Sequence, residues 1–171
     1  MNSKPKDKED LIKGFQKLID LFFITKYDNL TEDQKREIDD NPVKYYIPWT
    51  AVWNANSVST SCRPVFNASC STDSGYSLND LLPKGRNSLN KLVQIFIRWL
   101  VRECAFHTDI QKMYNTIKLA SHHWCYQLCL FNNELDLNAK PDVHVIMTLI
   151  YGVRTSGNQA EMAVRETAKL F

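Results

Sequence analysis

The sequence predicts an α+β fold, because helical and strand-like patterns occupy separate stretches of the chain instead of alternating regularly. Its 171 residues suffice for one ordinary domain, and a hydrophobic content of 44% with 23% charged residues is typical of globular proteins. The expected order is α-α-β-β-loop-α-β-(β)-β-β-α. We divide it into a helical lead-in over residues 1–43, a hairpin and loop over 44–86, and a third part over 87–171.

The lead-in is predicted to hold two helices. Apolar residues from Leu11 to Phe22 recur at helical spacing and form one stripe. Thr31-Glu-Asp-Gln34 then has the pattern of a capping box, which opens a short charged helix ending near Ile38. Neither helix carries an arrangement that indicates chemistry.

The second part is predicted to be a β-hairpin followed by a loop. Aromatic and β-branched residues dominate Tyr45–Trp53, where Pro48 indicates an edge strand, and Cys62–Phe66 has the composition of the returning strand. Ser, Asp, Gly and Pro are frequent over residues 70–85, so we expect a loop with at most one helical turn at Leu78–Leu82.

The third part is predicted to begin with a helix and a strand. Helical apolar spacing predicts a core helix over residues 87–103, followed by a short apolar strand that ends at Asp109. Trp124–Phe131 and Val143–Tyr151 are the next strand candidates. A helix is expected from near Ser156 to the C-terminus.

Composition narrows the functional classes. The net charge of +2 argues weakly against a compact nucleic-acid-binding domain, whose surface is usually strongly basic. No apolar run is long enough for a membrane span and no secretory signal is visible, so we expect no membrane partner. Five cysteines, an odd number, indicate reduced thiols and an intracellular protein, cytoplasmic or nuclear and not secreted.

The decapeptide Ala105–Tyr114 is the most informative stretch. It places one carboxylate, Asp109, at the end of the predicted strand and an aromatic ring, Tyr114, five residues later. Two-metal nucleotide polymerases use a rigidly held carboxylate and a ring beneath the sugar in this way. An acidic residue in an ordinary turn is the simpler interpretation, and the ten residues alone favour it.

Three further segments change that balance. Taken in order with the Asp109 segment, they resemble the front half of a reverse transcriptase, most closely the BEL/Pao type of long-terminal-repeat retrotransposons. The resemblance runs from about Lys44 to the C-terminus. The three segments are Arg63-Pro-Val-Phe-Asn-Ala-Ser69, Ser77-Leu-Asn-Asp-Leu-Leu-Pro-Lys-Gly85 and Tyr151-Gly-Val-Arg-Thr-Ser-Gly-Asn158.

The resemblance implies a partial right-hand polymerase fold, with fingers at residues 44–86 and the first half of the palm at 87–171. Asp109 resembles the first catalytic, metal-binding carboxylate for Mg²⁺ or Mn²⁺, with the carbonyl of Ile110 as a further ligand. Tyr114 resembles the gate that excludes ribonucleotides, although a core aromatic under the sheet is an alternative.

The remaining positions imply substrate binding. Arg63 resembles the fingers arginine that binds the incoming triphosphate, for which a planar guanidinium is well suited; a plain surface arginine on a hairpin is the alternative. Tyr151 and Gly152 resemble the start of the segment that supports the nascent base pair, with Gly152 allowing close backbone approach. An acid is common in the family where Asn67 stands here. The implied partners are an RNA or DNA template-primer and a deoxynucleoside triphosphate.

The implied chemistry is incomplete, because two metal ions require at least two converging carboxylates. The family supplies the others from a Tyr-x-Asp-Asp hairpin, which would begin about where the sequence ends at Phe171. We therefore expect a fragment of an RNA-directed DNA polymerase, inactive alone, with the remaining polymerase segments as a further partner. The alternative is a co-opted nucleic-acid-binding or protein-interaction module without catalysis.

Overall fold

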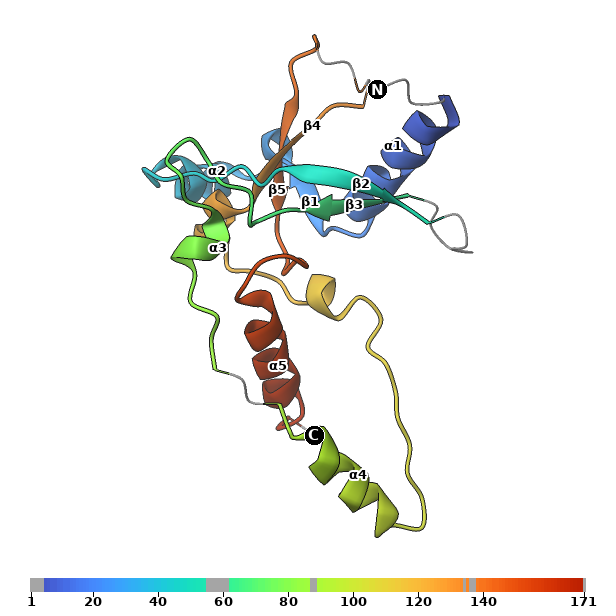
Figure 1. The fold of residues 1–171 in the computed structure, drawn as a ribbon. Coiled ribbons are helices and arrows are strands. Elements are labelled where there is room, and N and C mark those ends of the chain that lie inside the picture. Colours follow the sequence, from blue (N-terminus) through green and yellow to red (C-terminus); the bar gives the residue numbers. More distant parts are fainter. Residues whose placement is uncertain (1–4, 55–61, 87–88, 134, 136–137, 171) are drawn as a thin grey trace.

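The computed structural model, which describes residues 5–54, 62–86, 89–133, 135 and 138–170, contains a three-stranded antiparallel sheet, seen in the upper half of Figure 1. Its middle strand is β5 (Asp142–Ile146), between β1 (Ile24–Lys26) and β4 (Leu128–Phe131). Val145 of β5 lies opposite Thr25 on one side and Leu128 on the other. The fold is thus a mixed α+β arrangement, as predicted.

The predicted hairpin is confirmed. β2 (Trp49–Trp53) pairs antiparallel with β3 (Cys62–Phe66), with Trp49 opposite Phe66 and Trp53 opposite Cys62. The other elements in chain order are α1 (Pro5–Asp20), η1 (Tyr27–Asn29), α2 (Glu32–Asp39), α3 (Leu78–Leu81), α4 (Leu92–Leu100), η2 (Met113–Thr116), η3 (Ser121–Tyr126) and α5 (Ser156–Thr167), where η denotes a 3₁₀ helix.

Local sequence signals explain where two of these helices begin. At α2, the side chain of Thr31 accepts a hydrogen bond from the backbone N–H of Gln34, whose side chain accepts one from the N–H of Thr31. Ser77 and Asp80 form the same reciprocal cap at α3. Each cap satisfies backbone donors that the first helical turn leaves free, so both predicted helix starts are confirmed.

One face of the sheet is covered by α1 and the hairpin. Phe15 of α1 is fully buried there, stacked on Phe131 with ring centroids 3.8 Å apart and edge-to-face against Trp49 at 4.6 Å. Gly14 lets the helix approach β3 closely, since a Cβ at this position would lie 3.1 Å from the carbonyl oxygen of Cys62. The lead-in therefore supplies both a core helix and, through β1, an edge strand.

The opposite face is covered by α2 and η3. Ile38 of α2 packs there with Trp124 and Cys125 of η3, against Leu128 and Val145 of the sheet. All five cysteines of the chain are free thiols. Within the part of the chain that the structure describes, no helix has both the length and the apolar character needed to cross a bilayer.

Two predictions in the third part of the chain are wrong. The expected core helix is shorter, at Leu92–Leu100, and none of its residues is buried; Leu100 is 85% exposed. The segment expected to form a strand into Asp109 is not a strand, and Phe106 within it is 87% exposed. A strand requires backbone partners, and no strand pairing involves residues 102–112 in the described structure.

Several other elements begin or end a few residues away from their predicted bounds. The predicted strand at residues 124–131 forms only from Leu128, after the 3₁₀ turn of η3, and the strand predicted at 143–151 ends at Ile146. α5 begins at Ser156 as expected but ends at Thr167. The three-residue strand β1 was not predicted at all.

Candidate functional site

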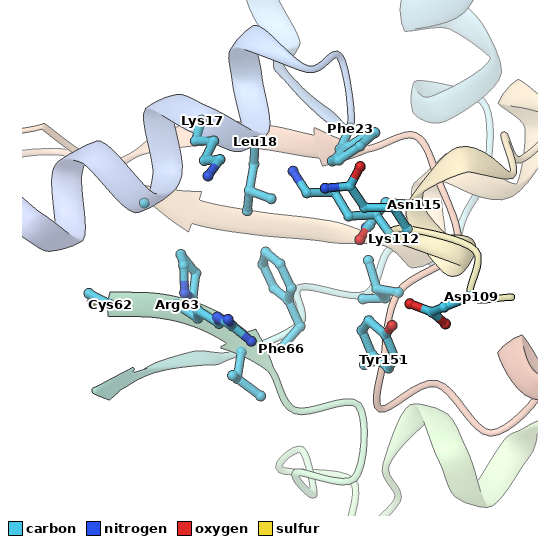
Figure 2. Close-up of a pocket in the computed structure, with 15 residues that line it drawn as sticks. Lys17, Leu18, Phe23, Cys62, Arg63, Phe66, Asp109, Lys112, Asn115 and Tyr151 are labelled. Atoms are coloured by element: carbon cyan, nitrogen blue, oxygen red, sulfur yellow. The ribbon is translucent and has the colours of Figure 1, made fainter. Parts of the chain in front are cut away.

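An open cavity of about 710 Å³ lies where α1, β3, the segment before η2 and the loop after β5 meet (Figure 2). Its charged and aromatic lining comes from all four places. The residues that matter below are Lys17 from α1, Arg63 from β3, Asp109 and Lys112 from the segment before η2, and Tyr151 from the loop after β5.

The cavity brings together three of the site residues predicted from the sequence: Arg63, Asp109 and Tyr151. A fourth, Tyr114, contacts this group through its ring, whose centroid lies 4.3 Å from that of Tyr151. The fifth and sixth, Ile110 and Gly152, adjoin lining residues in sequence but do not line the cavity themselves. Thus residues from the 63–69, 109 and 151–158 segments, distant in sequence, share one site.

Gly152 holds the Tyr151 loop against the end of β3. Its φ of +95° lies in the left-handed region, which glycine adopts without strain. A Cβ here would lie 2.7 Å from the carbonyl oxygen of Phe66. The resemblance implies that Gly152 lets the backbone approach the nucleotide closely; in the structure the close neighbour is the Phe66 carbonyl of the chain's own β3.

Asn79 connects the remaining sequence segment to the site. Its side chain is buried, at 8% exposure, and makes three hydrogen bonds of 2.7 Å. The amide nitrogen donates to the Ser69 hydroxyl and to the carbonyl of Gly152, while the amide oxygen accepts from the backbone N–H of Arg154. Asn79 therefore fixes the loop that carries Tyr151 relative to the segment after β3.

The described residues that line the cavity include more cations than carboxylates. Lys17, Arg63 and Lys112 contribute three cations against the single carboxylate of Asp109. None of the ion pairs among the described residues involves Arg63, Asp109 or Lys112. Burial raises the pKa of the Cys62 thiol, so this cavity residue stays neutral near pH 7. Such a site favours an anion.

Lys112 is held in an unusual conformation. Its backbone has φ 54° and ψ 36°, in the left-handed region, and its ammonium group lies 5.3 Å from the centre of the Phe23 ring. Burial lowers its pKa, and the nearby Lys17 ammonium lowers it further. The lysine is thus directed into the cavity at a cost in backbone and electrostatic energy.

The donor set does not fit a pair of divalent cations. Among the described residues that line the cavity, Asp109 is the only carboxylate. Elsewhere in the described ranges no three His, Cys, Asp or Glu side chains gather as metal ligands either. The cations of Lys17, Arg63 and Lys112 also oppose binding of further positive charge. We therefore derive no step through a metal ion.

Three contributors to the site were missed in the sequence. Lys17 has the pattern of an ordinary helix-surface lysine, and nothing local indicates that Lys112 adopts a left-handed backbone. Asn79 is not among the site residues expected from the sequence, yet its three hydrogen bonds link segments that lie far apart along the chain. Contacts of that range leave no periodic signal in one sequence.

Comparison with known proteins does not assign the chain to a family. Neither a scan against models of protein families nor a search of curated proteins gave a match.

Proposed function

We propose that this chain derives from the fingers and first palm half of a retrotransposon reverse transcriptase, and that its cavity binds the triphosphate of a deoxynucleotide. One observation carries the proposal: Arg63, Asp109 and Tyr151, which the resemblance assigns separately to substrate and catalysis, line one cavity. A surface arginine, a turn aspartate and a loop tyrosine with unrelated roles would have no reason to meet.

Each side chain has a physical task in this proposal. The Arg63 guanidinium would bind phosphate oxygens through two parallel N–H donors, a geometry that suits a planar anion edge. Tyr151, whose ring is exposed and backed by that of Tyr114, would offer an aromatic surface to the nucleoside. Asp109 supplies one carboxylate, which is insufficient for nucleotidyl transfer by two metal ions.

The chain on its own should therefore bind nucleotide without polymerising it. We expect saturable binding of dTTP, weakened at least about tenfold in Arg63→Gln, since a charged hydrogen bond contributes about 1.5–3 kcal/mol. Arg36→Gln, on α2 and outside the cavity, is the matched control and should bind like the wild type. The absence of saturable binding, or equal affinity for Arg63→Gln, would contradict the proposal.

A primer-extension assay with Mg²⁺ or Mn²⁺ tests the expected lack of polymerase activity. The purified chain should incorporate no nucleotide. Robust incorporation that disappears in Asp109→Ala would show that the proposed inactivity is wrong.

A second candidate function, a protein-interaction module without catalysis, is favoured by α4. The exposed fractions of its apolar side chains include 49% at Phe96, 56% at Ile97 and 85% at Leu100, and clustered apolar surface marks interaction sites. If α4 has this role in self-association, analytical ultracentrifugation should show an oligomer that Phe96→Asp dissociates. Phe106→Asp, exposed but outside the helix, should leave the oligomer intact. A monomeric wild type would remove the support for this candidate.

A further inference from the structure

Two lysines from different elements enter the cavity beside Arg63. Lys17 projects from α1, and Lys112 comes from the turn before η2, whereas Arg63 stands on β3, against which α1 packs (Figure 2). The resemblance gives neither lysine a role. The cavity therefore contains cationic groups on separate walls, not a single charged edge.

The placement of Lys112 opposes its own backbone preference. A left-handed conformation costs a non-glycine residue about 1–2 kcal/mol, and Lys112 adopts it at φ 54°. The ammonium group lies over the Phe23 ring, which also lines the cavity. The conformation directs a cation into the cavity, and backbone outliers of this kind are typical of ligand sites.

The positive charges in the cavity favour a ligand with several negative groups. The ammonium groups of Lys17 and Lys112 repel each other, and Asp109 is the one carboxylate among the described residues that line the cavity. A single phosphate presents its charge at one point, whereas a triphosphate offers separate oxygens along a flexible chain. A triphosphate can therefore contact cations from more than one wall at once.

We propose that Lys17 and Lys112 are additional triphosphate-binding residues, which bind phosphate oxygens on the α1 side of the cavity while Arg63 binds others from β3. This rests on the proposed nucleotide function and names the residues that would complete its phosphate subsite. It also gives the helical lead-in a direct role in the site, through Lys17.

The test is calorimetric titration of the full chain with inorganic triphosphate and, separately, with dTTP, in buffer without divalent cations. The variants are Lys17→Met and Lys112→Met, which keep an apolar side chain and remove the charge. Lys13→Met is the control for Lys17, because Lys13 is an exposed residue one turn earlier on α1 that does not line the cavity. Lys118→Met, exposed and outside the cavity, is the control for Lys112.

We expect each of Lys17→Met and Lys112→Met to weaken binding of both ligands at least about tenfold, as for loss of one charged hydrogen bond. The two controls should change affinity by less than about twofold. Lys17→Arg and Lys112→Arg should restore most of the affinity, which separates loss of charge from loss of folding. Orthophosphate should bind much more weakly than triphosphate.

The outcomes separate the two proposals. If triphosphate and dTTP bind and depend on Arg63 but not on the lysines, the lysine assignment is wrong and the nucleotide proposal stands. If neither ligand binds the wild type, both are wrong. Orthophosphate binding as tight as triphosphate binding would overturn the assignment to a polyphosphate chain.

Discussion

α1 and α4 are both amphipathic helices, but in the part of the chain that the structure describes α1 is packed against other elements and α4 has no buried residue. Phe15 of α1 is fully buried among Trp49, Phe66 and Phe131, while Phe96 of α4 is 49% exposed and its only ring contact in the described structure is Trp99, on the same helix. An apolar stripe predicts where a helix can be buried. Burial itself depends on a second surface that the stripe does not specify.

Two irregular segments near the cavity also differ in how well they are packed. The Tyr151–Gly152 loop is irregular yet fixed by Asn79 and by close packing on Phe66. The segment 103–110 is also irregular, but all of its residues are exposed. Asp109 thus lies at the boundary, where an exposed segment reaches a cavity formed by packed elements.

The strongest test of this contrast compares Phe15→Ala with Phe96→Ala. Removing a buried phenyl ring costs about 3–5 kcal/mol, so Phe15→Ala should lower the free energy of unfolding by that amount. Phe96→Ala should lower it by less than about 1 kcal/mol, since half of the side chain is already in water. Urea denaturation followed by circular dichroism measures both. Equal losses would mean that α4 is packed in solution.

The parts of the fold that were predictable rest on local signals. The cap of α2, formed by Thr31 and Gln34, and the β2–β3 hairpin are determined by residues close in sequence. The prediction of a strand before Asp109 is wrong because a β-strand requires a partner strand. Apolar composition at Phe106 does not provide one. The three residues of β1 are too few to show an alternating pattern.

The site was predictable only as separate residues. Arg63, Asp109 and Tyr151 were identified one at a time, and their meeting in a cavity is a tertiary property. Lys17 and Lys112 were not identified, because a helix-surface lysine and a lysine in a turn are ordinary in sequence. Their position in the cavity, and not their residue type, distinguishes these two lysines from the other lysines of the chain.

Asn79 gives a smaller test of how firmly the site loop is held. Asn79→Ala leaves the Gly152 carbonyl and the Arg154 N–H without their 2.7 Å partner, and should cost about 1–3 kcal/mol of unfolding free energy. Asn115→Ala is the control, because Asn115 makes one longer bond of 3.3 Å to the Leu149 carbonyl. Thermal unfolding of the two variants should rank them in that order. A loss for Asn79→Ala no larger than the control's would show that the loop is held by other contacts.

The smallest expected effect is a pH dependence from the sheet core. His144 on β5 is buried, and burial lowers its pKa, so the folded state binds a proton less readily than the unfolded chain, whose imidazole pKa is about 6.5. The histidine's contribution to stability is therefore present above about pH 6.5 and is lost as the pH falls. When the pH is lowered from about 7.5 to 5.5, the urea concentration at the unfolding midpoint should fall less for His144→Gln than for the wild type. His107→Gln, exposed, should retain the full dependence.

Amide hydrogen exchange, followed residue by residue with and without inorganic triphosphate, tests the central claim most directly. That claim is that a packed sheet supports an anion-binding cavity while the apolar residues of α4 stay exposed. Without ligand, β4 and β5 should exchange slowest and α4 fast. Triphosphate should slow exchange in β3 and in residues 109–115 and leave α4 unchanged. Protection of α4 equal to that of β5, or no change at the cavity on saturation with triphosphate, would contradict the account.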